Sequence, residues 1–415
     1  MRNGRLAATS SCAALIITLA GCSTPLSSTP AVHRGSTRAS APVTTTSPLA
    51  TAPPSATPTT VPVRVEQAPG WTGSLTTLPP GGGFTSLSCI SDTFCVASGG
   101  GANQTDALAT TGSGVAVSWD GASWSDPSVY FPAPATGSTS APIMPTLACT
   151  VGPICVIADG SGHVSTGDGT NWSAPAPLPS APPLPASPAD PGADHPGSRR
   201  SAVSCPAPDF CAFVDNTGHA TSLRSGTWAS PQAFGTPSGS GTVALYHPGG
   251  IGLSCPSSSS CTAVVGTAIL DWNGSTWSEE QLPWSTAPDA GASGATAISC
   301  PTTTLCVIVD GRTVSYRTPG HGWSPAQDID PQGGLDAITC PTTSFCLTAD
   351  THGSVVTWDG SHWSSPHQVL PPSTEYTGAG TSVSCPSDQF CMVMDGDGDY
   401  ATYVGPTTGS VATGP

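Results

Sequence analysis

Three aspartates near the end of the chain, Asp395, Asp397 and Asp399, alternate with glycines in the sequence MDGDGDY. Carboxylates at alternate positions are one way to surround a Ca²⁺ ion, which binds oxygen ligands. No glutamate follows at the distance that completes a familiar calcium loop. Because Asp and Gly also form tight turns readily, a plain turn is the first interpretation and a Ca²⁺ site the second. We expect no other cofactor.

Aspartate and histidine recur together at two further places, as Asp159 with His163 and as Asp215 with His219. A carboxylate and an imidazole at this spacing are compatible with a metal site or a pH-sensitive site. Solvated turns are the default interpretation of both pairs. The sequence contains no glycine-rich phosphate loop, nucleophile elbow or helical metal motif, so no catalytic constellation stands out.

Fourteen of the sixteen cysteines form seven pairs at one constant spacing: Cys89/Cys95, Cys149/Cys155, Cys205/Cys211, Cys255/Cys261, Cys300/Cys306, Cys340/Cys346 and Cys385/Cys391. Zinc binding is the rival of disulfide formation. However, the pairs lack the tight spacing of zinc knuckles, and no histidine follows them at a fixed offset. We therefore expect seven disulfides, which an exported location permits.

Each cysteine pair belongs to a repeated unit, such as AITCPTTSFCLTADTHGSVVTWDGSHWSSP at residues 337–366. A short run ends at the first cysteine, and a turn separates it from FCLTAD. Asp/Gly turns then separate FCLTAD from SVVTW, and SVVTW from a last stretch that starts at Trp363. Each unit thus predicts four antiparallel strands, with the cysteines across the first hairpin. Seven such units predict an all-β fold, a seven-bladed β-propeller with four-stranded antiparallel blades.

A tryptophan starts the expected fourth strand in six of the units: Trp124, Trp172, Trp228, Trp277, Trp323 and Trp363. The seventh unit ends in PTTGSVATGP without one. The text PGWTGSLTTLPPG at residues 69–81 precedes the first unit and matches NWSAPAPLP at residues 171–179. We expect residues 71–78 to supply the outer strand of the last blade, which closes the ring and removes an open sheet edge.

The turns before these tryptophans, in WDGASW, DGTNW, WNGSTW and WDGSHW, resemble the Asp-box of sialidase-like bacterial propellers. They are a variant, because the aspartate is adjacent to the glycine and not two residues before it. The whole unit, SC-P-x-x-x-FC-x-x-x-D, resembles the repeat of secreted actinobacterial propeller proteins. This resemblance covers about residues 71–403 and implies the fold more than an activity.

A sialidase-like enzyme needs an arginine cluster for a carboxylate, a tyrosine nucleophile paired with an acid, and an aspartate as acid/base. The family's arginine motif at the first blade is absent. After the N-terminal region the arginines are Arg199, Arg200, Arg224, Arg312 and Arg317, and the glutamates are Glu279, Glu280 and Glu375. The sequence therefore favours a protein that is not an enzyme, with a glycan-directed enzyme of sialidase-like propeller type as the alternative.

The N-terminus resembles the signal of a bacterial lipoprotein. Arg2 and Arg5 precede an apolar run, residues 6–20, that is too short to span a bilayer. The run ends in LAGC, which resembles a lipobox. The resemblance implies that residues 1–21 are a signal peptide and that Cys22 is lipidated, with palmitate among the acyl groups. A plain secretory signal is the alternative.

Residues 22–70 are rich in Ser, Thr and Pro and predict a disordered linker, with the propeller at residues 71–404 and a flexible tail at 405–415. The chain has 10 basic residues, all arginine, against 26 acidic ones, which argues against a nucleic-acid partner. We expect a monomer held by its lipid anchor on the outer face of the bacterial cytoplasmic membrane.

The longest connections join the fourth strand of one unit to the first strand of the next, at residues 125–145, 178–200, 231–249 and 279–295. Loops on a rigid scaffold commonly carry function. We expect a binding face there, with Tyr130, Phe131, Tyr246, His247 and Trp284 as exposed aromatic candidates. The alternative is that these aromatics cover the blade ends. The expected function is a non-enzymatic binding or scaffold module for a protein or a cell-envelope glycan, and a passive envelope protein is a further possibility.

Overall fold

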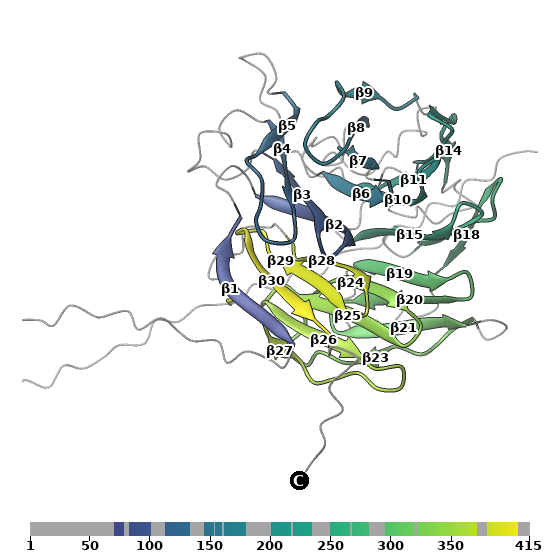
Figure 1. Ribbon diagram of the computed structural model, residues 1–415. Helices are drawn as coiled ribbons and strands as arrows, with labels where there is room; N and C mark the ends of the chain where they lie inside the picture. Colours follow the sequence, from purple (N-terminus) through teal and green to yellow (C-terminus); the bar gives the residue numbers. More distant parts are fainter. Residues whose placement is uncertain are drawn as a thin grey trace, which may run out of the picture. The chain divides into compact units, whose positions relative to one another are not determined.

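The computed structural model describes residues 70–78, 83–100, 113–132, 145–152, 154–159, 162–179, 201–216, 219–234, 250–265, 268–281, 295–318, 322–371 and 380–405 (Figure 1). The chain divides into the units Met1–Pro62 and Val63–Pro415, and all of these residues belong to the second unit. They form strands, turns and connections, and none of them belongs to a helix able to cross a membrane. Cys22, the expected signal peptide and all of the expected tail except Gly405 lie outside the described residues.

Seven antiparallel sheets follow one another along the chain, and we number them as blades 1 to 7 in that order. Within each blade the strands are given from the inner strand outward. Blade 1 contains β2 (Phe84–Ser91), β3 (Phe94–Gly100), β4 (Gly114–Trp119) and β5 (Ser128–Phe131). Blade 2 contains β6 (Thr146–Thr150), β7 (Ile154–Ala158), β8 (His163–Gly167) and β9 (Ala176–Pro177). Blade 3 contains β10 (Ser201–Ala207), β11 (Phe210–Asp215) and β12 (His219–Arg224), with β13 (Thr227–Trp228) and β14 (Gln232–Ala233) both beside β12.

The remaining blades repeat this order. Blade 4 contains β15 (Ile251–Ser257), β16 (Ser260–Val265), β17 (Ala268–Trp272) and β18 (Trp277–Gln281). Blade 5 contains β19 (Ala297–Thr302), β20 (Leu305–Asp310) and β21 (Thr313–Thr318), with β22 (Gly322–Trp323) and β23 (Gln327–Asp328) beside β21. Blade 6 contains β24 (Leu335–Thr342), β25 (Phe345–Asp350), β26 (Ser354–Trp358) and β27 (His367–Gln368). Blade 7 contains β28 (Ser382–Ser387), β29 (Phe390–Met394), β30 (Asp399–Val404) and β1 (Trp71–Thr77).

The inner strands of neighbouring blades contact one another in a closed cycle. The cycle runs through β2, β6, β10, β15, β19, β24 and β28 and returns to β2. Seven sheets in this arrangement, each four strand positions wide because the outer position of blades 3 and 5 is shared by two short strands, form a seven-bladed β-propeller, which confirms the predicted fold class.

The outer strand of blade 7 comes from the other end of the described chain. β1 pairs antiparallel with β30, with Trp71 opposite Tyr403 and Thr77 opposite Asp399. Figure 1 shows this N-terminal strand beside the C-terminal strands. Because β1 covers the outer side of β30, that edge is not left open for pairing with another chain.

All seven expected disulfides are present, and each joins the first and second strands of a blade. From blade 1 to blade 7 they are Cys89–Cys95, Cys149–Cys155, Cys205–Cys211, Cys255–Cys261, Cys300–Cys306, Cys340–Cys346 and Cys385–Cys391. In blade 1, for example, the two cysteines lie directly opposite each other in the strand register. Closing so short a loop stabilises the fold by about 2 kcal/mol in the chain-entropy model. The disulfides thus reinforce hairpins whose inner strands are rich in small and hydroxyl side chains.

The two cysteines of a pair are unequally buried, a difference that their constant spacing did not predict. The first cysteines are 5% to 9% exposed, whereas the second ones are only 0% to 3% exposed. These second cysteines are Cys95, Cys155, Cys211, Cys261, Cys306, Cys346 and Cys391. They belong to the hydrophobic clusters of the blades, as Cys155 does with Ile157 and Cys391 with Val393. Both cysteines of each pair are therefore part of the core, and the first ones lie slightly nearer to solvent.

The serine before the first cysteine joins one blade to the next. The Ser88 hydroxyl accepts the N–H of Cys149 at 2.9 Å, and the Ser384 hydroxyl accepts that of Cys89 at 2.8 Å. The same bond recurs in three more pairs: Ser204 with Cys255, Ser254 with Cys300, and Ser299 with Cys340. The N–H groups that donate to these hydroxyls lie on the free edge of each first strand, where no neighbouring strand pairs with them. The repeated Ser-Cys sequence therefore has a structural role at the blade junctions.

The expected fourth strand is divided in most blades. Trp124, Trp172 and Trp363 form only single bridges with the third strand. The serine that follows donates its N–H to a third-strand carbonyl, while its hydroxyl accepts the N–H of the same residue, as in Ser125 with Ser118. This side-chain bond takes the place of a ladder bond and interrupts the pairing. Among the described outer strands that start at such a tryptophan, β18 of blade 4 is the one that continues unbroken, from Trp277.

Candidate functional site

An aspartate ends the second strand, or directly follows it, in five blades: Asp159, Asp215, Asp310, Asp350 and Asp395. In four of these turns the Oδ1 atom accepts the N–H of the residue four positions later, at His163, His219, Ser354 and Asp399, over 2.7 to 3.0 Å. These aspartates therefore fold the turns between the second and third strands, which we call the acidic turns. The turn interpretation of the recurring Asp/Gly text agrees with these bonds.

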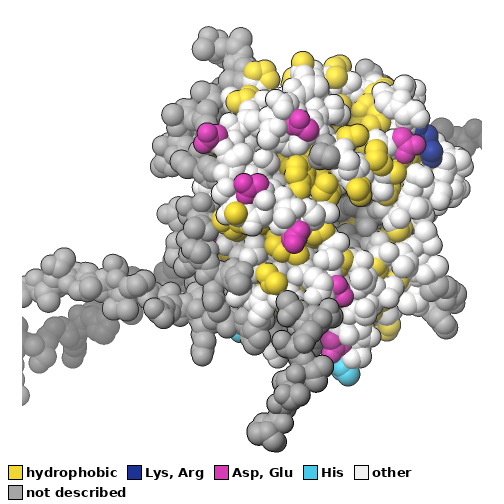
Figure 2. Space-filling model, in the orientation of Figure 1, with side chains coloured by type: hydrophobic (Ala, Val, Ile, Leu, Met, Phe, Trp, Pro, Cys, Tyr) yellow, Lys and Arg dark blue, Asp and Glu magenta, His cyan; other side chains and the backbone are white. Residues whose placement is uncertain are grey.

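The two ends of the blades carry different features. Because neighbouring strands are antiparallel, the disulfide-bearing turns and the turns between third and fourth strands lie at one end. The acidic turns, and the connections from each outer strand to the next blade, lie at the other. On the face that Figure 2 shows, acidic side chains are scattered singly, and one basic side chain lies beside an acidic one.

Both predicted Asp/His pairs are brought together, each within its own acidic turn. The Nδ1 atom of His163 lies 3.4 Å from Oδ2 of Asp159, and that of His219 lies 3.5 Å from Oδ2 of Asp215. A third, looser pair joins His352 and Asp350 over 4.0 Å. In the described ranges, no three His, Cys, Asp or Glu side chains are positioned together to hold a metal ion.

The alternating aspartates of blade 7 form another acidic turn. Oδ1 of Asp395 accepts the N–H groups of Asp397 and Asp399 at 3.0 and 2.9 Å. Burial raises the pKa of Asp395 to about 6, and the nearby carboxylates of Asp399 and Asp397 also raise it. One oxygen of Asp395, the candidate calcium ligand, is thus already used in folding the turn, which was the first interpretation of this sequence.

Carboxyl groups from two different segments meet between blades 5 and 6. Asp330, in the connection from β23 to β24, is 0% exposed, and Asp350, at the end of β25, is 2% exposed. Oδ1 of Asp330 accepts the N–H of Gln332 at 3.1 Å, whereas its buried Oδ2 has no hydrogen-bond partner. Burial raises the pKa of Asp350, and the charge of Asp330 adds to the shift. Asp350 therefore favours its protonated form more than an exposed aspartate does.

Sequence reasoning missed Asp330. The described connection that holds it, residues 329–334, joins two blades without a long insertion, and Gly334 donates its N–H to the Gly311 carbonyl at 2.8 Å. The short length of this connection was its only signal in the sequence, because the residues DIDPQGG do not indicate that the side chain of Asp330 is buried. The N–H of Asp330 donates to the carbonyl of Arg312 at 3.2 Å, and Arg312 pairs with Asp328 at 2.8 Å, while the half-exposed His352 pairs with Asp350 over 4.0 Å.

The expected exposure of Tyr130 and Phe131 is wrong, because these side chains are only 1% and 5% exposed. They lie in β5, where Tyr130 donates its hydroxyl to the Gly99 carbonyl at 2.8 Å and contacts the ring of Trp172 in the next blade. Both therefore fill the junction between blades 1 and 2, as in the alternative that aromatics cover the blades. Tyr246, His247 and Trp284 lie outside the described residues.

The arginines considered for a carboxylate-binding cluster lie at separate places with separate partners. Arg224 donates to the carbonyls of Ser258 and Gly274 in the next blade. Arg312 pairs with Asp328, and Arg317 pairs with Asp271. Arg199, Arg200 and Glu375 lie outside the described residues, while Glu279 and Glu280 lie in β18.

The Asp-Gly turns before the tryptophans are folded by their own side chains. Oδ1 of Asp168 accepts the N–H groups of Thr170 and Asn171 at 2.9 and 2.7 Å, and Gly169 adopts a φ of 95°. Asp120, Asn273 and Asp359 make the equivalent bonds. These N–H groups lower the pKa of Asp168 well below its usual range, so the aspartate stays charged.

No protein-family model and no curated protein sequence matches the chain. Solved structures with the same fold do. YCF48 bound to D1 peptide is 14% identical with a TM-score of 0.52, covering 82% of this chain and 99% of that one. Virginiamycin B lyase from Staphylococcus aureus is 9% identical with a TM-score of 0.53, covering 78% and 96%. The WD40 β-propeller domain of Doa1 is 9% identical with a TM-score of 0.54, covering 82% and 99%.

Proposed function

We propose that this chain is an extracytoplasmic, membrane-anchored binding scaffold whose propeller presents one end to a protein or glycan of the cell envelope. One observation carries the proposal: at six long stretches of sequence, the described strands on either side end and begin at the acidic-turn end of the blades. These stretches are residues 101–112, 133–144, 180–200, 235–249, 282–294 and 372–379. Long loops grafted on one side of a rigid scaffold are the usual arrangement of a binding surface.

The opposite end supplies the rigidity that such a scaffold needs. Its first hairpins carry the seven disulfides, and its outer turns are held by the Asp-Gly bonds described above. Serine hydroxyls and aromatic contacts join neighbouring blades. A rigid ring allows loops to be ordered in advance, which lowers the entropy that binding costs.

Charge favours a protein partner with a basic surface among the envelope molecules. The chain has a formal net charge of −16, because only 10 basic residues, all arginine, offset the 26 acidic ones. Such a field attracts cationic partners and repels nucleic acid. YCF48, one of the proteins similar in fold, was solved with a peptide bound, while virginiamycin B lyase is named as an enzyme. The fold alone is therefore compatible with a binding protein and with an enzyme.

The anchor follows from the lipobox-like text. In this proposal Cys22 carries the lipid, residues 22–70 act as a spacer, and a monomeric propeller stands at the outer face of the cytoplasmic membrane. A Cys22→Ala variant should move from the membrane fraction to the soluble fraction and lose incorporation of labelled palmitate. Membrane retention of that variant would contradict the anchor.

The binding surface is testable by site-specific photo-cross-linking on intact cells. A photoreactive residue at Ser138 or Thr236 probes the connections, and one at Thr303 or Ser361 probes the disulfide end as a matched control. We expect a defined cross-linked partner from the first two positions only, identified by mass spectrometry. Equal capture from both ends, or none from either, would contradict the proposed surface. Turnover of an envelope glycan by the purified protein would instead support the enzyme alternative.

A further inference from the structure

The seven disulfides occupy equivalent positions, but the residue that faces them from the third strand differs. Opposite the second cysteine of blades 1 to 7 stand, in order, Trp119, Gly167, Leu223, Trp272, Arg317, Trp358 and Tyr403. Blade 5 is thus the blade in which this position is charged. Its disulfide joins Cys300 in β19 to Cys306 in β20.

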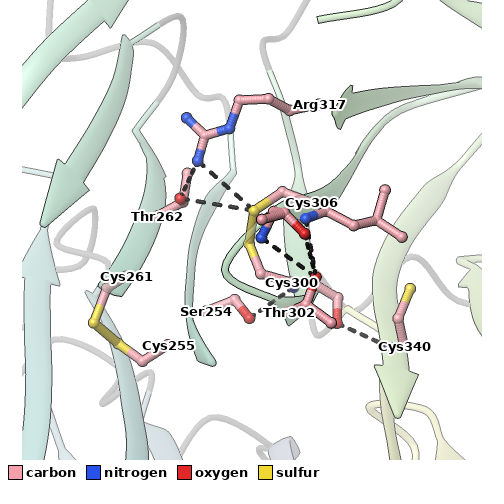
Figure 3. The surroundings of a disulfide bond; sticks show 12 residues. Ser254, Cys255, Cys261, Thr262, Cys300, Thr302, Cys306, Arg317 and Cys340 are labelled. Carbon is pink, nitrogen blue, oxygen red and sulfur yellow. Dashed lines mark hydrogen bonds between the residues drawn. A yellow bond between two sulfur atoms is a disulfide. The ribbon is translucent and has the colours of Figure 1, made fainter. Parts of the chain in front are cut away.

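The guanidinium of Arg317 lies directly beside the second sulfur of this disulfide. Its Nη2 atom is 3.8 Å from Sγ of Cys306, and Oγ1 of Thr262 in the neighbouring blade is 3.7 Å from the same sulfur. Figure 3 shows both side chains pointing toward Cys306 from different strands. The sulfur therefore lies beside a guanidinium, a charged group that the other six pairs lack at this register position.

Several contacts hold the guanidinium in place. Asp271 of blade 4 accepts two hydrogen bonds from it, at 2.6 and 2.8 Å, and Thr262 accepts a third at 2.5 Å. The guanidinium also lies over the ring of Trp323, 5.2 Å from its centroid. The Arg317 side chain is 24% exposed, so water screens its charge only in part.

The chemistry of disulfide exchange gives this environment a consequence. An incoming thiolate attacks Sγ of Cys300, the S–S bond breaks, and its electron pair leaves on Sγ of Cys306 as a thiolate. The second thiol of the same dithiol then attacks the mixed disulfide and releases Cys300, so the dithiol is oxidised as the protein disulfide is reduced. Exchange is faster when the leaving thiol has a lower pKa, and a neighbouring arginine lowers it.

We propose that Cys300–Cys306 is a thiol–disulfide exchange site for a dithiol reductant, and that Arg317 distinguishes it from the six structural disulfides. Access does not make the distinction, because the first cysteines of all seven pairs are 5% to 9% exposed. The environment of the leaving sulfur, Sγ of Cys306, makes the distinction. In blade 1, by contrast, Sγ of Cys95 lies 3.9 Å from the carbonyl oxygen of Ser91, which disfavours a thiolate.

Reduction at this site would act on the junction between blades 4 and 5. Opening Cys300–Cys306 frees the hairpin of β19 and β20, and Cys306 pairs with Arg317 in the strand register. Arg317 in turn forms the bidentate ion pair that links blade 5 to Asp271 of blade 4. The exchange site is thus connected to one specific blade junction.

The test is a time course of partial reduction with dithiothreitol on the full mature chain, stopped by alkylation and mapped by peptide mass spectrometry. The other six disulfides serve as internal controls. We expect Cys300 and Cys306 to be alkylated first, roughly threefold faster or more than any other pair. Equal rates for all seven pairs, or faster opening of another pair, would overturn the proposal.

Two variants separate charge from loosening of the blade junction, since both remove the same ion pair. Arg317→Leu removes the positive charge, so reduction of Cys300–Cys306 should slow toward the rate of the other pairs. Asp271→Asn leaves the guanidinium unneutralised, so reduction should accelerate, and Arg317→Lys should retain part of the wild-type rate. Acceleration in both Arg317→Leu and Asp271→Asn would show that loosening alone sets the rate and would refute the role of Arg317. The wild-type time course decides the site itself even if a variant does not fold.

Discussion

Trp71 lies opposite Tyr403 in the strand register, with their ring centroids 5.6 Å apart, although 332 positions of the chain separate them. Trp71 is 7% exposed and belongs to the hydrophobic cluster that joins blades 6 and 7. The contact therefore seals the ring at the point where the two ends of the propeller meet.

Truncation of this contact should weaken the closure. We expect Trp71→Ala to lower the free energy of unfolding by about 3–5 kcal/mol, because it removes a buried aromatic side chain. Deletion of residues 71–78 should destabilise blade 7 further, since β30 then has an open edge. Denaturant unfolding measures the first effect, and hydrogen exchange in β28 to β30 locates the second. Val404→Ala, at a 46% exposed position of β30, is the control and should change little. Undiminished stability after the deletion would rule out the closure model.

The serine bonds between blades should each contribute measurably. Ser254→Ala removes the acceptor of the Cys300 N–H at the junction of blades 4 and 5. We expect a loss of about 1–3 kcal/mol in unfolding free energy. Thr303→Ala, in the exposed turn of blade 5, is the matched control and should be neutral within about 0.5 kcal/mol. Equal effects of the two substitutions would contradict the role of the serine.

Asp395 should make stability depend on pH. Its folded pKa, about 6, lies above the ordinary value, so the folded state binds the proton more tightly than the unfolded state. Stability should therefore fall as the pH rises from about 4 to about 6 and stay level above that. Asp395→Asn keeps the Oδ1 acceptor and removes the charge, so it should reduce this slope, while the raised pKa values of Asp310, Asp350 and Asp399 leave a remainder. Thermal unfolding between pH 4 and pH 8 measures it, with the exposed Asp92→Asn as a control. A slope in Asp395→Asn equal to that of the wild type would disprove the assignment.

Removal of one charge from the buried pair of Asp330 and Asp350 should stabilise the junction of blades 5 and 6. Asp330→Asn keeps the oxygen that accepts the N–H of Gln332 and replaces the unpaired Oδ2 with a donor. We expect a higher melting temperature near pH 7.5, with a smaller gain near pH 4, where Asp350 is protonated more fully. The control is Asp328→Asn, because Asp328 and its partner Arg312 are both half-exposed, so this substitution removes a charge at the surface. A lower melting temperature at pH 7.5 would argue against repulsion between the two carboxyl groups.

Calcium should have little effect on the melting temperature. The Oδ1 atom of Asp395 is occupied by two backbone N–H groups, which leaves an incomplete ligand set in the turn of Asp397 and Asp399. Differential scanning fluorimetry with millimolar CaCl₂ and with EDTA tests this. A rise of several degrees that disappears in Asp397→Asn would show that the turn does bind the ion.

Much of the fold was predictable because its signals are local. Cys340 and Cys346 lie six positions apart on one hairpin, so their spacing across the predicted turn, with the expected export, predicted a disulfide. The tryptophan that is missing from the seventh unit pointed to Trp71 because each blade repeats the same text. The exception at this level was the divided outer strand, where serine side chains after the tryptophans replace backbone bonds.

The sequence by itself determined the strand order within the blades, the number of blades and the pairing of cysteines, since these follow from neighbours along the chain and, for the outer strand of blade 7, from the repeat that Trp71 completes. Only the tertiary structure decided which residues of different blades meet. It buried Tyr130 against Trp172, brought Asp330 to Asp350, and placed Arg317 of blade 5 against Thr262 and Asp271 of blade 4. Contacts between blades join residues that are far apart along the chain. The lateral register and side-chain directions that create these contacts have no periodic signal, so they emerge only when the blades pack around the ring.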